Sequence, residues 1–143
     1  MSSAYNRARL YHTQSVLTTS PGQLVLMLYD GIIRFLDQAQ EAGLRTEDPR
    51  RIEIMNTAIT KAQNILTELR SNLNFEAGGD YARDLDRLYD YYLRRLFQAN
   101  LSKDNAPLAE VSRLVAQLRE GWAEMLKQEA GRAYDSTRGV AVA

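Results

Sequence analysis

The chain has 143 residues, of which 45% are hydrophobic and 25% charged, and it contains no cysteine. Its 18 basic and 18 acidic residues cancel, which disfavours a nucleic-acid partner, and the missing cysteines exclude disulfides and thiolate chemistry. The longest apolar run, Leu24 to Tyr29, is far shorter than the ~20 residues that a membrane-spanning helix needs. We therefore expect a single cytoplasmic domain over residues 1–143 that does not insert into a membrane.

The first 19 residues are polar, with scattered apolar side chains and no acid. Arginine, serine and threonine give them a superficial likeness to a transit peptide, but they lack the apolar middle of a secretory signal. We interpret residues 1–19 as a mobile N-terminal arm with at most one short helix. Its apolar residues Tyr11, Val16 and Leu17 are the ones expected to cover an apolar surface elsewhere in the chain.

The first helix is predicted from Pro21 to Ala42, because Ser20, Pro21 and Gln23 form a helix-start signal. One apolar stripe suffices to face a core. It consists of Val25, Leu28, Tyr29, Ile32, Phe35, Leu36 and Ala39. Leu26, Met27 and Ile33 fall on the other side, so this helix must also be covered by the bundle, the arm or a partner.

The second helix is predicted to start at Asp48 as the cap and Pro49 in the first turn. Its apolar residues recur in steps of three and four, which indicates a packed seam. The seam is Ile52, Met55, Ile59, Ala62, Leu66, Leu69 and Leu73. Ile54, Ala58 and Ile65 form a second, weaker stripe about a quarter turn away.

A bend at Gly78-Gly79 separates this helix from a third, predicted from Tyr81 to Ala99 with Asp80 as the cap. Its inward face is expected to be Tyr81, Leu85, Leu88, Tyr92, Leu96 and Ala99, with Tyr89, Leu93 and Phe97 at the side. A fourth helix is predicted over residues 106–128, with Pro107 in its first turn. Its seam is Leu108, Val111, Val115, Leu118, Trp122 and Met125.

These elements predict an all-α fold in which residues 21–128 form an antiparallel four-helix bundle, followed by a disordered tail over residues 129–143. No segment has the alternating pattern of a strand.

Catalysis is not expected. His12 is the only histidine and lies in the arm, so a serine or cysteine nucleophile would have no stable base. The Glu-x-x-His pairs of di-iron bundles are missing, and Gly78-Gly79 is not followed by the Lys-Ser or Lys-Thr of a phosphate loop. We therefore predict no catalytic residues, no metal and no cofactor.

Several features instead point to a surface that binds another helix. The residues expected to line this groove are Leu26, Met27, Ile33, Ile54, Ile65, Tyr89, Leu93 and Phe97. Eight tyrosines against three phenylalanines suit a surface that is sometimes wet and sometimes covered, although packing at the bundle edge would also explain them. The charged residues Asp30, Asp90, Arg94 and Arg95 stand in apolar stretches, either as ion pairs of the bundle or as groups that hold a bound chain.

The sequence also resembles the FliS family of flagellar export chaperones for flagellin. The matching text spans residues 11 to 126 and comprises Tyr11, Ser15-Val16, residues 19–31 (TSPGQLVLMLYDG), residues 61–70 (KAQNILTELR), residues 88–91 (LYDY), residues 94–96 (RRL), Ala99-Asn100, Glu110-Val111 and residues 118–122 (LREGW). Ile32, Tyr92 and Gly121 depart from the family's usual pattern, which affects the expected groove shape and partner choice rather than the fold.

The resemblance implies a cytoplasmic, non-enzymatic bundle that binds the disordered C-terminal segment of flagellin, blocks premature filament assembly and delivers the subunit to the flagellar export apparatus, a type III secretion system. It also implies that the arm can lie over the apolar surface. Whether an anti-sigma factor or a second flagellin-binding regulator shares that surface stays open. Without the resemblance, a structural bundle whose extra apolar faces form a homo-oligomer would be the main alternative.

Overall fold

The computed structural model describes residues 21–142, and over this range it confirms an all-α fold. The four helices are α2 (Pro21–Leu44), α3 (Arg51–Ser71), α4 (Phe75–Ser102) and α5 (Asn105–Val142). The predicted arm over residues 1–19 lies outside the described residues.

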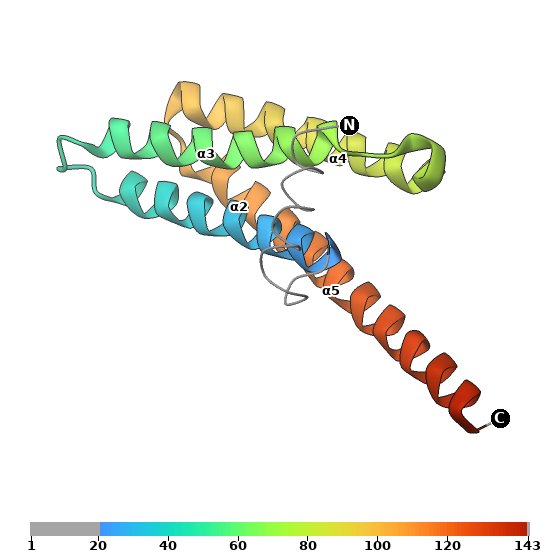
Figure 1. Ribbon diagram of the computed structural model, residues 1–143. Coiled ribbons are helices and arrows are strands. Elements are labelled where there is room, and N and C mark those ends of the chain that lie inside the picture. The colour runs from blue at the N-terminus through green and yellow to red at the C-terminus, as the bar shows by residue number, and fades with distance from the viewer. Residues whose placement is uncertain (1–20, 143) are drawn as a thin grey trace.

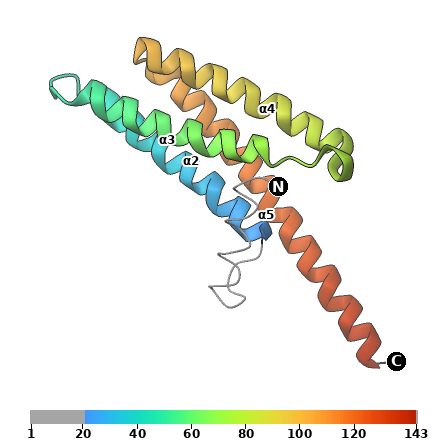
Figure 2. The same ribbon diagram turned by 45° about the horizontal axis from the view of Figure 1, so that its top comes forward.

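The helices form a four-membered bundle in which sequential helices run antiparallel (Figures 1 and 2). Helix α2 packs against α3 and α5, and α4 packs against the same two helices. Helices α2 and α4 lie diagonally across the described bundle, so their backbones do not approach as closely as those of neighbouring helices, and only side chains meet between them. The bundle can be described as two helix pairs, α2 with α5 and α3 with α4, which contact each other where α2 packs on α3 and α4 packs on α5. In Figure 1 these two pairs diverge toward the end of the bundle at which α2 begins.

The core consists largely of the predicted seams. Its fully buried large side chains are Tyr29, Ile32, Leu36, Met55, Ile59, Leu66, Tyr89, Leu96, Leu108, Val111 and Val115. Leu66 and Leu69 are buried as predicted, whereas Leu118 and Trp122 are half-buried and pack against the core. Ile52, in the first turn of α3, stands on the predicted seam but is exposed.

Helix α4 buries Leu85, Tyr92, Leu96 and Ala99 as predicted but differs from the prediction at two positions. The prediction put Tyr81 and Leu88 inward, but their side chains are 52% and 39% exposed. Ala82 and Tyr89 are buried instead, and Tyr89 is only 2% exposed. The buried series of α4 still steps by threes and fours: it is Ala82, Leu85, Tyr89, Tyr92, Leu96 and Ala99. The Tyr29 hydroxyl gives the Tyr89 hydroxyl a buried hydrogen-bond partner, which makes burial of Tyr89 favourable.

Two helix starts differ from the predicted ones. Helix α3 begins at Arg51 rather than Pro49, since Asp48 accepts a hydrogen bond from the Arg50 N–H at 2.9 Å in a turn that precedes the helix. A turn of helix precedes the predicted bend, and Asn74 caps it by accepting from the Ala77 N–H at 3.0 Å. The bend itself is confirmed at Gly79, whose φ of 53° and ψ of −127° are non-helical.

The fourth helix was predicted to end near residue 128 and continues instead to Val142. Its last turns project away from the other three helices (Figure 1).

Polar contacts hold the end of the bundle where α2 and α4 finish. The Arg51 guanidinium donates to the carbonyl of Gly43 at 3.0 Å and to that of Lys103 at 3.1 Å, so one side chain joins both interhelical turns. The Asn105 amide donates to the Gln40 carbonyl at 2.9 Å and sits where a Cβ on Gly43 would project. We call this region, residues 40–51 and 102–105, the closed end.

None of the helices over residues 21–142 combines the length and apolar character required to cross a bilayer.

Candidate functional site

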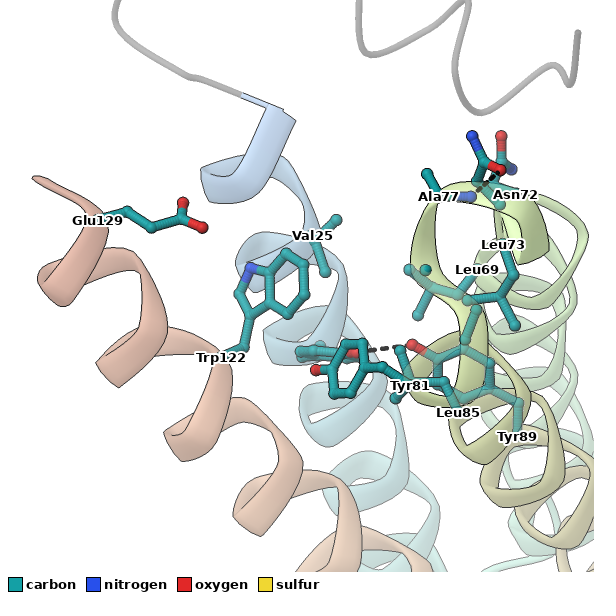
Figure 3. A pocket seen from close by; sticks show the side chains of 14 residues that line it. Val25, Leu69, Asn72, Leu73, Ala77, Tyr81, Leu85, Tyr89, Trp122 and Glu129 are labelled. Atoms are coloured by element: carbon teal, nitrogen blue, oxygen red, sulfur yellow. Dashed lines mark hydrogen bonds between the residues drawn. The ribbon is translucent and has the colours of Figure 1, made fainter. Parts of the chain in front are cut away.

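An apolar cleft of about 620 Å³ opens at the end of the bundle opposite the closed end. Its lining residues come from all four helices and from the α3–α4 turn. They are Val25, Tyr29, Leu69, Asn72, Leu73, Asn74, Ala77, Gly78, Tyr81, Ala82, Leu85, Tyr89, Trp122 and Glu129. Figure 3 shows Val25, Trp122 and Glu129 on one side and the leucines and tyrosines of α3 and α4 on the other.

The floor of the cleft is a pair of buried tyrosines. The hydroxyls of Tyr29 and Tyr89 lie 2.6 Å apart and share a hydrogen bond that joins α2 to α4. Burial raises the pKa of Tyr29 to about 12, partly offset by the hydrogen bond from Tyr89. Burial, followed by the interaction with Tyr29, also raises the pKa of Tyr89. Both phenols are therefore neutral at any physiological pH, and because their hydroxyls bind each other they form an uncharged aromatic floor.

The α5 wall of the cleft is built on Trp122. Its indole N–H donates to the Gly22 carbonyl at 2.8 Å, which satisfies a polar group in a half-buried side chain. Its ring meets Tyr29 edge to face, with centroids 6.5 Å apart and planes at 88°. Gly22 lets α5 come this close, because a Cβ there would clash with the side chain of Leu126. The aromatic wall is thus held rigidly against the first turn of α2.

The rim is more polar than the floor. Asn72, Asn74 and Glu129 lie at the mouth, and the half-exposed ring of Tyr81 stands beside them. An apolar floor with a few polar groups at the rim suits apolar side chains of a peptide whose backbone stays near water. Within the described residues no three histidine, cysteine, aspartate or glutamate side chains gather as metal ligands.

Of the residues predicted to line a groove, the structure places only Tyr89 in this cleft. Leu26 and Ile33 lie on the side of α2 that faces α5. Leu26 is one turn from both Gly22 and Asp30, which contact α5, and Ile33 is two turns further along the same face.

The remaining predicted groove residues lie on other faces. Ile65 packs beside Gly31 on the α2–α3 side, and Ile54 lies three turns earlier on the same face of α3. Leu93 and the 59%-exposed Phe97 lie on the α3 side of α4, and Met27 is exposed on the outer face of α2. The predicted residues therefore form patches on several faces rather than one groove.

The charged residues in apolar stretches form ion pairs within the bundle. Asp30 binds Arg119 at 2.6 Å, and Asp90 binds Arg70 and Arg94, each at 3.1 Å. The Arg95 guanidinium donates to Glu110 at 2.6 Å, and the Tyr91 hydroxyl donates to the same carboxylate at 2.7 Å. Their role in packing the helices agrees with the simpler of the two interpretations.

Sequence reasoning assigned most residues of the cleft to the core. Tyr29, Leu69, Leu85 and Trp122 do stand on the seams, and their step pattern gave no reason to expect a cavity. The available signal was the bend at Gly78-Gly79, which diverts the start of α4 and leaves the seam ends partly uncovered.

Comparisons with known proteins agree on one family. The family model described as "Flagellar protein FliS" matches residues 1–129. The chain is 38% identical over 119 residues to the flagellar secretion chaperone FliS of Bacillus subtilis, covering 83% of this chain and 85% of that protein. It is 38% identical over 112 residues to the protein of the same name from Salmonella typhimurium, covering 78% and 80% of the two chains. The corresponding protein of Campylobacter jejuni is 34% identical over 126 residues, covering 88% and 93%.

Proposed function

Because the chain belongs to the FliS family of flagellar proteins, it is a flagellar secretion chaperone, and we propose that it binds the C-terminal segment of flagellin in the cytoplasm. Binding prevents premature polymerisation of flagellin, and the chaperone then delivers the subunit to the flagellar export apparatus. The role is binding, not catalysis.

The apolar cleft is the observation that carries this proposal. It offers a cavity of about 620 Å³ with an aromatic floor and a polar rim, formed where the two helix pairs diverge. A disordered segment with apolar side chains gains affinity by burying them there. Part of the binding energy is spent on ordering the segment, which keeps the complex reversible, as delivery to an export apparatus requires.

The apolar patches outside the cleft extend the proposed binding surface. The predicted groove residues Leu26, Ile33, Ile54, Ile65, Leu93 and Phe97 are all half-buried or exposed. Since these patches lie on different faces, a single straight helix does not cover them and the cleft together. We therefore propose that the flagellin segment follows the surface over more than one face of the bundle.

Co-purification tests the proposal directly. Full-length flagellin should co-purify with the chain in a 1:1 complex, and flagellin lacking its C-terminal segment should not. If both forms or neither form is retained, the proposed partner segment is wrong. Mass measurement of the free chain separates the alternative of a homo-oligomeric structural bundle, which predicts a stable oligomer whose mass does not change when the flagellin segment is added.

A further inference from the structure

Two cations converge on one phenylalanine at the outer side of the α2–α3 contact. The Arg34 guanidinium carbon and the Lys61 ammonium nitrogen each lie 5.4 Å from the centroid of the Phe35 ring. Arg34 belongs to α2 and Lys61 to α3, so the ring brings together two charges that the sequence separates. We call Arg34 and Lys61 the cation pair. Because both lie 5.4 Å from the Phe35 centroid, the distance between their charges is at most twice that value.

The surroundings of the cation pair are apolar. The Ile65 side chain lies 3.2 Å from the position that a Cβ on Gly31 would occupy. Because glycine has no side chain, α2 and α3 can pack closely at this point. Phe35 and Ile65 are both half-buried, and Met27 is 47% exposed one turn before Gly31. The face thus combines an apolar strip with two positive charges.

Neither cation has a carboxylate partner among the described residues. Arg34 and Lys61 instead contact the Phe35 ring, and each cation–ring attraction contributes about 0.5–1 kcal/mol at an exposed site. Many other arginines of the described chain do pair with carboxylates: Arg45, Arg70, Arg83, Arg87, Arg94, Arg95 and Arg119. The Glu41 carboxylate, two turns beyond Arg34, is bonded to Arg45 at 2.9 Å. The cation pair therefore remains available to an outside acid.

The N-terminal segment of the chain does not supply that acid. Residues 1–20 contain no aspartate or glutamate.

Resting on the proposed function, we propose that this face is a second contact for the flagellin segment and that the cation pair binds its acidic side chains. The apolar side chains of the segment lie over Ile65 and Met27 while one or two carboxylates meet Arg34 and Lys61. Because each cation lies 5.4 Å from the ring centroid, two acids no more than two helical turns apart can reach both cations. The contact selects for an acidic, amphipathic segment and speeds its association.

Charge reversal tests the proposal. The double variant R34E/K61E and the wild-type chain are titrated with a purified peptide of the flagellin C-terminal segment at two salt concentrations, by calorimetry. The matched control is R113E/K127E, which reverses two exposed cations of α5 and gives the same net charge. Circular dichroism and thermal unfolding confirm that each variant is folded.

We expect R34E/K61E to bind the peptide at least about tenfold more weakly than wild type at low salt, and the control about equally to wild type. High salt should reduce the difference in peptide affinity between R34E/K61E and wild type, because salt screens the charges. A peptide whose acidic residues are changed to lysine should recover binding to R34E/K61E. Equal losses in both double variants, or no loss in either, would overturn the cation-pair proposal. A wild-type chain that fails to bind the peptide at all would instead refute the proposed function. Self-association that disappears in R34E/K61E would assign the face to a second copy of the chain and also overturn the proposal.

Discussion

The hydroxyl of Tyr29 on α2 lies 2.6 Å from that of Tyr89 on α4, and this hydrogen bond links two helices that lie diagonally across the bundle. It forms the floor of the apolar cleft. The bond therefore holds together the two helix pairs at the point where they begin to diverge.

Removing one hydroxyl should leave the other unsatisfied. We expect Tyr89→Phe to lower the free energy of unfolding by about 1–3 kcal/mol, because the buried Tyr29 hydroxyl loses its partner. The double variant Tyr29→Phe/Tyr89→Phe should cost less than the sum of the two single changes, since no polar group is then stranded. Urea unfolding of the four proteins measures the coupling. Strictly additive losses would show that the hydroxyls do not interact.

Trp122 is the only tryptophan of the chain, and it forms one wall of the cleft. When the flagellin C-terminal segment enters the cleft, the half-buried indole should lose water contact. We expect its fluorescence emission to shift to shorter wavelength and its quenching by iodide to fall. Trp122→Phe supplies the background signal. An unchanged spectrum at a peptide concentration that calorimetry shows to be saturating would place the bound segment elsewhere.

Ile65 and Leu66 are neighbours with different surroundings, and they form a matched pair. Leu66 is fully buried, so Leu66→Ala should destabilise the fold by roughly 2–5 kcal/mol. Ile65 is half-buried on the α2–α3 face, so Ile65→Asp should lower the melting temperature less than Leu66→Ala but weaken flagellin binding about tenfold or more. Thermal unfolding measures the melting temperature, and calorimetry measures the affinity for the flagellin segment. If Ile65→Asp collapses stability while the folded fraction binds normally, Ile65 belongs to the core.

Glu110 should make stability depend on pH in the acidic range. The hydrogen bond from Tyr91, followed by the one from Arg95, lowers the pKa of Glu110 below its usual value. A carboxylate with a lowered pKa in the folded state stabilises the fold above its unfolded pKa of about 4.3, and this contribution is lost as pH falls through the folded pKa. We expect Glu110→Gln to unfold at a lower urea concentration than wild type at pH 7 and to approach it near pH 3. A difference that is constant from pH 7 to 3 would contradict this linkage.

The N-terminal arm stays a prediction, since residues 1–19 lie outside the described part of the chain. Deleting residues 2–16 removes Tyr11 and Val16, which were expected to cover apolar surface. The truncated chain should self-associate more, by light scattering, and should bind flagellin as tightly as the full chain or more tightly, because no tethered competitor remains. Hydrogen exchange near Tyr11 at the unfolded rate, both alone and with the flagellin segment, would show that the arm plays no such part.

The periodicity of the sequence predicted the number, type and order of the helices and most of the core, because each seam repeats a clear pattern over several turns. The predicted inward face of α4 was wrong at Tyr81 and Leu88, where Ala82 and Tyr89 are buried instead. Leu88 is the more apolar choice, but burial of Tyr89 depends on a hydroxyl partner 60 residues away, which no local pattern shows.

The cleft could not be predicted for a related reason. Its residues are ordinary seam residues such as Leu69 and Leu85, and only the divergence of two helix pairs leaves them open. Conversely, surplus apolar residues such as Leu26 and Phe97 were correctly expected off the seams, but their distribution over several faces depends on the relative rotation of all four helices. Pairings such as Asp30 with Arg119 likewise arise only when the helices are assembled.

The hydrogen bonds of Arg51 at the closed end bear on the cleft at the other end of the molecule. They fix the end of α2 and the α4–α5 turn to the start of α3. The helices extend from this fixed end toward the cleft, and α3, with 21 residues, is about 30 Å long. Over such a length, a rotation of a few degrees at the closed end would move the far helix ends by about an ångström or more. We therefore expect a change at Arg51 to alter the width of the cleft, although Arg51 does not line it.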